Sequence, residues 1–248
     1  MTKFIAVTGG KGGVGKTTTA LNLGTALNGF GRDVIVLDGN LNNPDIGLHL
    51  GHSNVEVTFH DALSGDADIR DAIYRHTSGV RVIPGDIRGR KVKVKGMDKI
   101  CKRLEGISEV VVMDCPADMG LSKYAEEALV VAVPETTSVT AAMRTIKKLE
   151  DKNITVLGVV LNRVNGDEHE MSVDNVEALL EKPVIGVIPE SDDVRESQSI
   201  KYPVAYSHAD SEATTGFKSL AAHLIGERYN IKSEKGIYNS FLRKMGYK

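Results

Sequence analysis

The feature that most constrains the fold is a glycine-rich stretch near the amino terminus, VTGGKGGVGKTTTALNL at residues 7–23. Gly10, Gly15, Lys16 and Thr17 match the phosphate-loop pattern G-x-x-x-x-G-K-[ST], between an apolar run and a helical pattern. Glycines let the backbone wrap a phosphate with its N–H groups pointing inward, and the start of the helix adds a positive dipole end. The stretch therefore predicts a strand–loop–helix unit that binds phosphate.

The side chains of this loop suit a nucleoside triphosphate with Mg²⁺. Lys16 brings a point charge to the β- and γ-phosphates, and the Thr17 hydroxyl is a Mg²⁺ ligand in such loops. An ordinary glycine-rich turn is the competing interpretation, and the flanking strand and helix patterns argue against it. The residues predicted to contact ATP in this stretch are Gly10, Lys11, Gly12, Gly13, Val14, Gly15, Lys16, Thr17 and Thr18.

Two aspartates that follow apolar runs are candidate partners of the metal. Asp114 ends the segment EVVVMD, and Asp38 ends VIVLD. A Mg²⁺ site beside a phosphate loop needs an acidic residue at the end of a neighbouring strand. Each aspartate alone is equally well explained as a strand-end cap. With the loop present, we expect both to ligate Mg²⁺, directly or through water.

Apolar runs alternate with helix-length segments along the rest of the chain. Runs rich in Val and Ile, apolar on both sides of the alternation, predict strands buried on both faces. They lie at residues 4–8, 34–37, 80–84, 110–113, 128–133, 155–161 and 184–188. Helical patterns lie at 16–30, 96–104, 137–151 and 173–181, and Ser172 is a candidate cap for the last of these.

This order predicts an α/β fold with a doubly wound, mostly parallel sheet flanked by helices, as in P-loop NTPases. We expect one ATPase domain over residues 1–232 and a tail over residues 233–248. Composition narrows the class further. The net charge of −2 gives no global attraction to nucleic acid. The sequence contains no run of 18 apolar residues, the length needed to span a membrane. Cys101 and Cys115 form no CxxC pair. We expect a cytoplasmic protein.

Several motifs together resemble the MinD/ParA family of P-loop ATPases. KGGVGKTTTALNLGTAL is similar to the family's deviant Walker A motif, VIVLDGN lies where the family has its DxD element, and DCPADMG resembles switch II. VVLNRV and VIPESDDVRES resemble the elements on the adenine side, and VIPE and the carboxyl terminus favour the MinD branch. The resemblance covers nearly the whole chain.

The resemblance implies a function for each of the two lysines in the loop. Lys16 would serve the ATP of its own subunit, whereas Lys11 would reach the partner's phosphates in a nucleotide-sandwich homodimer. A solvated loop lysine is the alternative for Lys11. Asn162 would read the adenine edge, with Pro189 and Glu190 beside the base, and a strand-end turn is the alternative role for Asn162.

Position 40 departs from the family pattern. The family has an aspartate there that is implicated in hydrolysis, and this chain has Asn40, which carries no charge and takes up no proton at neutral pH. The resemblance assigns this position to catalysis together with Lys11 and Lys16, so we expect slow hydrolysis and a long-lived ATP dimer. An alternative is that Asp45, in the adjoining NNPDIG segment, substitutes for the missing carboxylate.

The tail carries an apolar stripe with basic residues beside it. Ile237, Phe241, Leu242 and Met245 share one face of a helix, and the positive charges are Lys235, Arg243, Lys244 and Lys248. Such a helix suits an anionic membrane surface, in agreement with the resemblance to the membrane-targeting helix of the MinD branch. Docking on the protein's own core is the alternative.

A second basic cluster lies at residues 88–103, RGRKVKVKGMDKICKR. It could bind DNA phosphates, as a ParA-like protein does, or be a solvated connection between a strand and a helix.

These patterns favour an ATPase switch of the MinD type. It would dimerise with ATP, bind the membrane peripherally in that state, and position a partner in cell division or spatial organisation. An unidentified protein would activate turnover. A DNA-binding partition ATPase is the second hypothesis. A carrier or insertion ATPase for a metal centre is the third; the absence of CxC and CxxC counts against it, although one cysteine per subunit could pair across a dimer.

Overall fold

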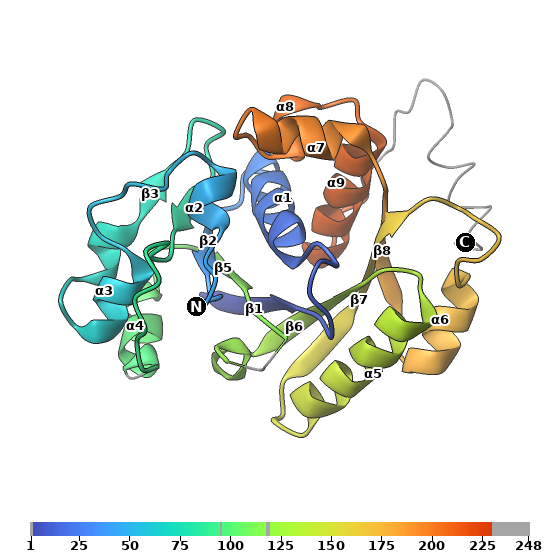
Figure 1. The fold of residues 1–248 in the computed structure, drawn as a ribbon, viewed down its shortest axis with the longest axis horizontal. Coiled ribbons are helices and arrows are strands. Elements are labelled where there is room, and N and C mark those ends of the chain that lie inside the picture. Colours follow the sequence, from blue (N-terminus) through green and yellow to red (C-terminus); the bar gives the residue numbers. More distant parts are fainter. Residues whose placement is uncertain (1, 95, 118–119, 230–248) are drawn as a thin grey trace.

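The computed structural model describes residues 2–94, 96–117 and 120–229. Their centre is an eight-stranded sheet in the order β3-β4-β2-β5-β1-β6-β7-β8 (Figure 1), parallel except where β3 pairs with β4. The strands are β1 (Lys3–Thr8), β2 (Val34–Asp38), β3 (Tyr74–Arg75), β4 (Arg81–Ile83), β5 (Val110–Asp114), β6 (Glu127–Ala132), β7 (Thr155–Val164) and β8 (Val184–Pro189).

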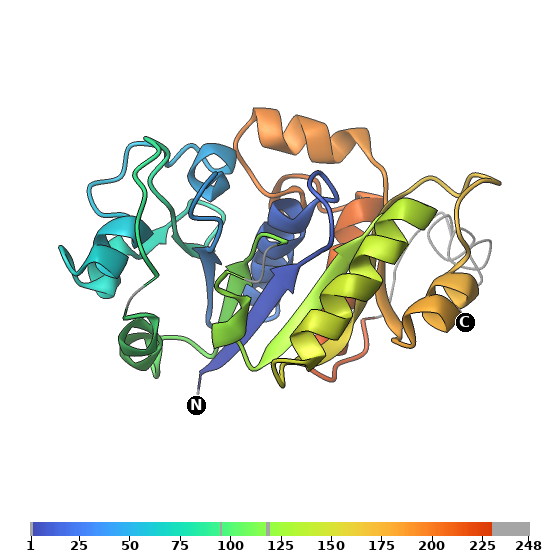
Figure 2. The same cartoon turned by 60° about the horizontal axis from the view of Figure 1, so that its bottom comes forward.

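Helices cover both faces of this sheet. Figures 1 and 2 show α1 and α9 on one face, with α5 and α6 on the other. The α-helices are α1 (Lys16–Gly29), α2 (Ile46–His49), α3 (Phe59–Ser64), α4 (Met97–Leu104), α5 (Thr136–Glu150), α6 (Val173–Leu180), α7 (Asp192–Ser199), α8 (Val204–Ser207) and α9 (Glu212–Leu224). Two short 3₁₀ helices are η1 (Ile69–Ala72) and η2 (Ser122–Tyr124). The predicted doubly wound fold is confirmed.

The double coverage explains why the strands read as continuous apolar runs. All five residues of β2 are buried, and alternate apolar side chains of the central strands, as in β1 and β2, enter two separate cores. One core lies beneath α1 and α9 and includes Leu23, Leu27 and Phe217. The other lies beneath α4, α5 and α6 and includes Ile146 and Val176. Burial on both faces leaves no polar side of the strand to alternate with the apolar one.

The predicted strands and the four predicted helices all form, with ends that shift by a few residues. Ser172 caps α6 as expected, because its hydroxyl accepts a hydrogen bond from the Asn175 N–H at 3.3 Å. The sequence patterns did not predict β3, α2, α3, α7, α8 or α9. Most of these elements are short, and α7 is largely polar.

The parallel order brings the carboxyl ends of β1, β2 and β5 to one edge of the sheet. Asp38 and Asp114, the last residues of β2 and β5, are direct register partners. The glycine-rich loop follows β1, which lies beside β5. The tail predicted at residues 233–248 lies outside the described residues. Among the helices of the described part of the chain, none has the length and apolar character needed to cross a membrane.

Candidate nucleotide-binding site

The glycines of the loop between β1 and α1 meet different local demands. Gly15 has a φ of +91°, and a side chain there would clash with the amide nitrogen of Asn162. Gly12 and Gly13 face open space, so their backbone N–H groups can be approached closely. A side chain at Gly10 would instead strike the backbone of Ala141 in α5. Gly10 therefore serves the packing of the loop, while the later glycines shape the concave surface for phosphate.

Lys16 and Thr17 begin α1 and point into this concave surface. The Lys16 ammonium donates a hydrogen bond to the Lys11 carbonyl at 2.9 Å, so its side chain lies across the loop. Burial lowers the pKa of Lys16, and the carboxylates of Asp114 and Asp45 oppose that shift. The Thr17 hydroxyl donates to Asp114 Oδ2 at 2.5 Å. The predicted loop residues and the strand-end acid are thus brought together.

The two acids at the strand ends are almost completely buried. Asp38 accepts hydrogen bonds from the N–H groups of Asn40 at 3.2 Å and Ile46 at 3.1 Å. Burial, followed by the charges of Asp114 and Asp45, raises the pKa of Asp38 well above its usual value. Burial also raises the pKa of Asp114 to about 7, although the Thr17 hydroxyl and Lys16 act in the opposite direction. Neighbouring buried carboxyl groups with raised pKa values are typical of functional sites.

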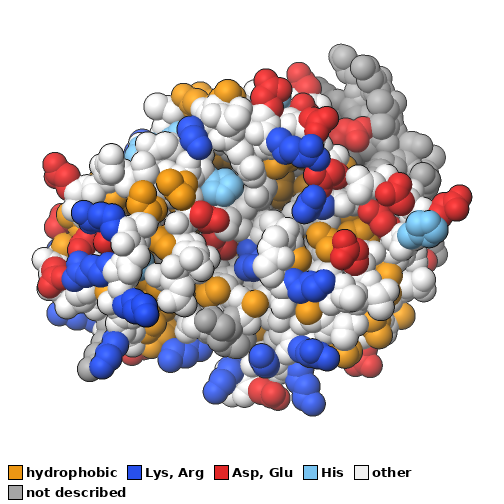
Figure 3. Space-filling model, in the orientation of Figure 1, with side chains coloured by type: hydrophobic (Ala, Val, Ile, Leu, Met, Phe, Trp, Pro, Cys, Tyr) orange, Lys and Arg blue, Asp and Glu red, His pale blue; other side chains and the backbone are white. Residues whose placement is uncertain are grey.

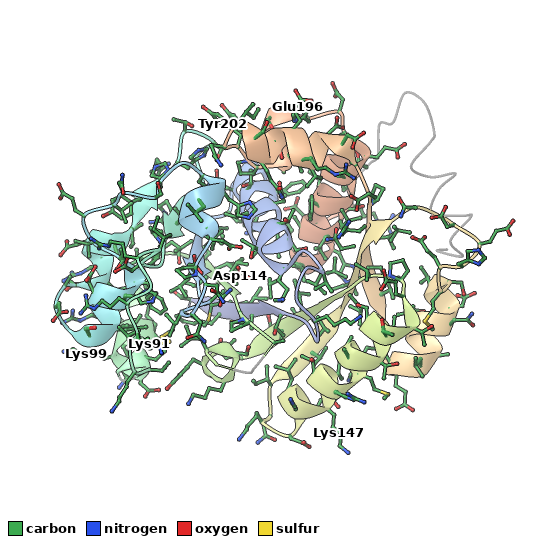
Figure 4. All side chains as sticks on the ribbon, in the orientation of Figure 1. Lys91, Lys99, Asp114, Lys147, Glu196 and Tyr202 are labelled. Atoms are coloured by element: carbon green, nitrogen blue, oxygen red, sulfur yellow. The ribbon has the colours of Figure 1, made fainter. Side chains whose placement is uncertain are left out.

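One oxygen of this acidic pair has no protein partner. Asp114 Oδ1 is buried and finds no hydrogen-bond partner among the described residues, while the other oxygen holds the Thr17 hydroxyl. A carboxylate and a hydroxyl side by side are the hard oxygen donors that Mg²⁺ prefers. The residues therefore fit the ion, which Thr17 and Asp114 would hold, and Asp38 is the register partner of Asp114. Figure 4 shows Asp114 at the centre of the molecule, deep beside α1.

Lys11 and Asn40 are oriented away from this acidic centre. Lys11 is exposed on the loop, and its ammonium donates to the Thr137 hydroxyl at the start of α5, at 2.7 Å. The side-chain oxygen of Asn40 accepts from the Asn43 N–H at 3.4 Å, within its own loop. Lys11 is therefore accessible to a second molecule, and Asn40 is engaged locally.

The other end of the cleft is formed by β7, β8 and α7. Asn162 lies within β7 and is buried, and its amide donates to the Val14 carbonyl at 2.9 Å. It is therefore a strand residue joined to the phosphate loop, and not a turn former at a strand end. A cavity of about 230 Å³ opens beside it, with Pro189 and Glu190 in its wall. The three residues predicted on the adenine side are thus brought to one cavity.

Arginines that sequence reasoning did not single out hold Glu190 in place. Arg163 donates to one of its oxygens at 2.7 Å and Arg195 to the other at 3.2 Å. Burial alone would raise the pKa of Glu190, but the two arginines outweigh burial and lower it. Gln198, also from α7, donates to the Thr18 hydroxyl at 3.3 Å. The serine cap and acidic first turn in SDDVRES were signals that could have located this helix.

The phosphate loop lies at the carboxyl edge of a parallel sheet, together with a lysine, a hydroxyl group and two buried acids. This combination defines a P-loop nucleotide-binding protein. Residues 5–204 match the family model described as CobQ/CobB/MinD/ParA nucleotide binding domain. The chain belongs to this family, as its motifs indicated.

Three similar proteins show which members of the family this chain resembles. An uncharacterised ATP-binding protein of Methanocaldococcus jannaschii is 36% identical over 239 residues, which are 93% of this chain and 90% of that protein. The cell division ATPase MinD of Pyrococcus furiosus is 32% identical, with a TM-score of 0.87 over 91% of this chain and 99% of that one. The septum site-determining protein MinD of Pyrococcus horikoshii, solved with Mg-ADP, is 31% identical, with a TM-score of 0.85 over 96% and 99%.

Proposed function

We propose that this protein is an ATP-hydrolysing switch that dimerises around ATP and Mg²⁺, binds an anionic membrane as a dimer, and positions a partner there. The observation that carries the proposal is the division between the two loop lysines. Lys16 lies across its own loop, whereas Lys11 is exposed at the edge of the site. A second copy facing this edge would receive the Lys11 charge at its phosphates, as an arginine finger supplies charge to a neighbouring site.

Within one subunit, the residues of the loop position the triphosphate. Lys16 and the N–H groups at the start of α1 would face the β- and γ-phosphates, and Thr17 and Asp114, which are hydrogen-bonded to each other, would hold the metal. Mg²⁺ bound here would neutralise charge on the β- and γ-phosphates. The ion, or water bound to it, would also supply the partner that the buried oxygen of Asp114 lacks among the described residues. Hydrolysis removes the γ-phosphate and weakens the shared contacts between the two copies.

Membrane attachment is assigned to residues 235–248, whose apolar stripe and basic residues suit an anionic surface. Burying a large apolar side chain contributes about 1.5–3 kcal/mol, and ordering the backbone costs about 1–2 kcal/mol per residue. One tail is therefore a marginal anchor. Two tails on one dimer act together through their high effective concentration, so attachment would follow the nucleotide state.

The DNA-binding alternative has less support because intramolecular ion pairs engage the arginines of residues 88–103. Arg88 pairs with Asp86 at 2.9 Å, Arg90 with two aspartates at 2.5 and 2.6 Å, and Arg103 with Asp68 at 2.9 Å. The segment is the connection from β4 to α4 and α4 itself. Lys91 and Lys99 of this segment are labelled on the left side of the molecule in Figure 4, and Figure 3 shows several Lys and Arg side chains on the same side.

The metal-centre alternative also has little support from the two thiols. Burial raises the pKa of the Cys101 thiol to about 11, which disfavours the thiolate form that binds metals. Cys115 is buried.

Co-sedimentation with vesicles tests the proposal directly. The full chain and a chain ending at Lys232 are each mixed with anionic vesicles in the presence of ATP or ADP. The Lys11→Ala variant of the full chain is mixed with the same vesicles in the presence of ATP. We expect sedimentation only for the full chain with ATP, and its loss in Lys11→Ala together with the ATP-dependent dimer. Plain duplex DNA in place of vesicles is the parallel assay. ATP-driven binding to DNA and not to vesicles would establish the alternative instead.

A further inference from the structure

Asp45 lies closer to the phosphate end of the cleft than its place in the sequence suggests. It immediately precedes α2, and the N–H of the next residue, Ile46, donates to the buried carboxylate of Asp38 at 3.1 Å. This hydrogen bond holds residue 45 beside the acidic centre. Asp45 accordingly acts on the pKa values of Lys16, Asp38 and Asp114.

The two oxygens of Asp45 have different surroundings. Oδ2 lies 3.8 Å from Nε2 of His49, one turn along α2. Oδ1 is buried and finds no hydrogen-bond partner among the described residues. A buried carboxylate oxygen without a partner is costly, so it points to a group that binds there during function. Nothing in the phosphate loop occupies that oxygen.

Asn40 is poorly suited to accept a proton from the attacking water, so this function is open to Oδ1 of Asp45. Its side-chain carbonyl is turned to the Asn43 N–H within the loop, and it carries no charge with which to attract a proton. Asp38 is fixed by two backbone N–H groups, and Asp114 holds Thr17. Of the three acids Asp38, Asp45 and Asp114, only Asp45 has an oxygen that neither accepts a backbone hydrogen bond nor belongs to the proposed metal site.

We propose that Asp45 supplies the carboxylate that orients the attacking water, a proposal that rests on the ATP hydrolysis proposed above. The water oxygen forms a bond to the γ-phosphorus while the bond from that phosphorus to the bridging oxygen breaks, and ADP leaves with the electron pair. The water proton passes to Asp45 and from there to solvent. Nε2 of His49 lies 3.8 Å from the other oxygen of this carboxylate. Position 45 thus takes over the function that Asn40 cannot perform.

The test moves the carboxylate between the two positions. Asp45→Asn, Asn40→Asp and the double variant Asn40→Asp/Asp45→Asn are compared with wild type in single-turnover hydrolysis. ATP affinity is measured alongside with a fluorescent analogue. Asparagine is nearly isosteric with aspartate and as good a residue before a helix, so α2 should persist. Asp71→Asn, on the exposed surface of η1, controls for the loss of one negative charge.

We expect Asp45→Asn to lower the single-turnover rate by about 10²-fold, the lower end of a general-base contribution, with ATP affinity within about threefold of wild type. The double variant should regain at least a tenth of the wild-type rate, and Asp71→Asn should match wild type. A structural role for Asp45 would instead weaken ATP binding and leave the double variant inactive.

Two further results would overturn the proposal. One is an Asp45→Asn rate within twofold of wild type, and the other is a slow double variant with normal ATP affinity. Wild type that binds ATP without hydrolysing it would overturn the proposed function as well, so the two failures are distinguishable.

Discussion

The two ends of the nucleotide cleft are constructed in opposite ways. At the phosphate end, Asp38 and Asp114 are buried next to each other, and Lys16 is the cation that acts on Asp114. At the base end, a single acid, Glu190, is held between two arginines. The first arrangement raises the pKa values of its acids, and the second lowers that of Glu190.

This difference indicates what each end requires from the ligand. The phosphate end has two buried carboxyl groups with raised pKa values and an oxygen without a partner among the described residues, so it gains most when a metal ion arrives with the nucleotide. The base end has its polar groups already paired, and Asn162 is joined to the loop at Val14. We therefore expect it to rearrange little when the proposed adenine ring binds. We expect substitutions at the phosphate end to have the larger effects.

The largest effect is expected for Lys16→Ala. It removes the cation facing the β- and γ-phosphates, so ATP affinity should fall by about 100-fold or more, equivalent to about 2.7 kcal/mol. Lys11→Ala is the matched control and should keep ATP affinity within about threefold in the monomer. Isothermal titration with ATP and Mg²⁺ measures both. Equal losses in the two variants would mean that the loop lysines are not divided between two copies.

The second effect concerns the pH dependence of stability without nucleotide, in EDTA. Asp114 has a pKa raised to about 7, so between about pH 4 and 7 the folded chain holds a proton that the unfolded chain has released. Its contribution to stability is therefore lost as pH rises through 7. From pH 5.5 to 8 this amounts to about 2 kcal/mol.

Asp114→Asn should remove most of that dependence, because asparagine does not titrate. Urea unfolding of wild type and variant at pH 5.5 and 8 measures the difference. Comparing the two proteins separates the contribution of Asp114 from that of Asp38, whose pKa burial also raises and which remains in both. Parallel slopes for the two proteins would show that Asp114 is ionised across the whole range.

A smaller effect is expected for Asn162→Ala at the base end. The variant loses the hydrogen bond to Val14 and the amide predicted to read the adenine edge, together worth about 1–1.5 kcal/mol or about tenfold in ATP affinity. Discrimination between ATP and GTP should fall with it, and competition binding measures that ratio. An unchanged ratio with weaker binding would assign Asn162 to the loop alone.

The smallest effect is expected for Arg163→Gln. Its pair with Glu190 is partly exposed, and Arg195 remains to hold the same carboxylate. Such pairs contribute about 0.2–1 kcal/mol, so ATP affinity should change by about fivefold at most. The same titration measures it, and a loss as large as that of Lys16→Ala would contradict the contrast between the two ends.

Local sequence determined the phosphate end almost completely. The loop, Lys16 and Thr17 are adjacent in the chain, and Asp38 and Asp114 could be identified because each ends an apolar run. A strand buried on both faces has a pattern readable within a few residues, and parallel strands place their last residues at one edge. The same logic predicted the doubly wound sheet.

Tertiary structure alone decided the contacts between distant segments. Asn162 meets Val14 across 148 residues, and α7 brings Arg195 to Glu190 and Gln198 to Thr18. The sequence left open whether Asp45 lies near the site, and the hydrogen bond from Ile46 to Asp38 decided it. These pairings depend on how complete elements pack, and a side chain's own neighbours in the chain carry no record of what lies opposite it in the fold.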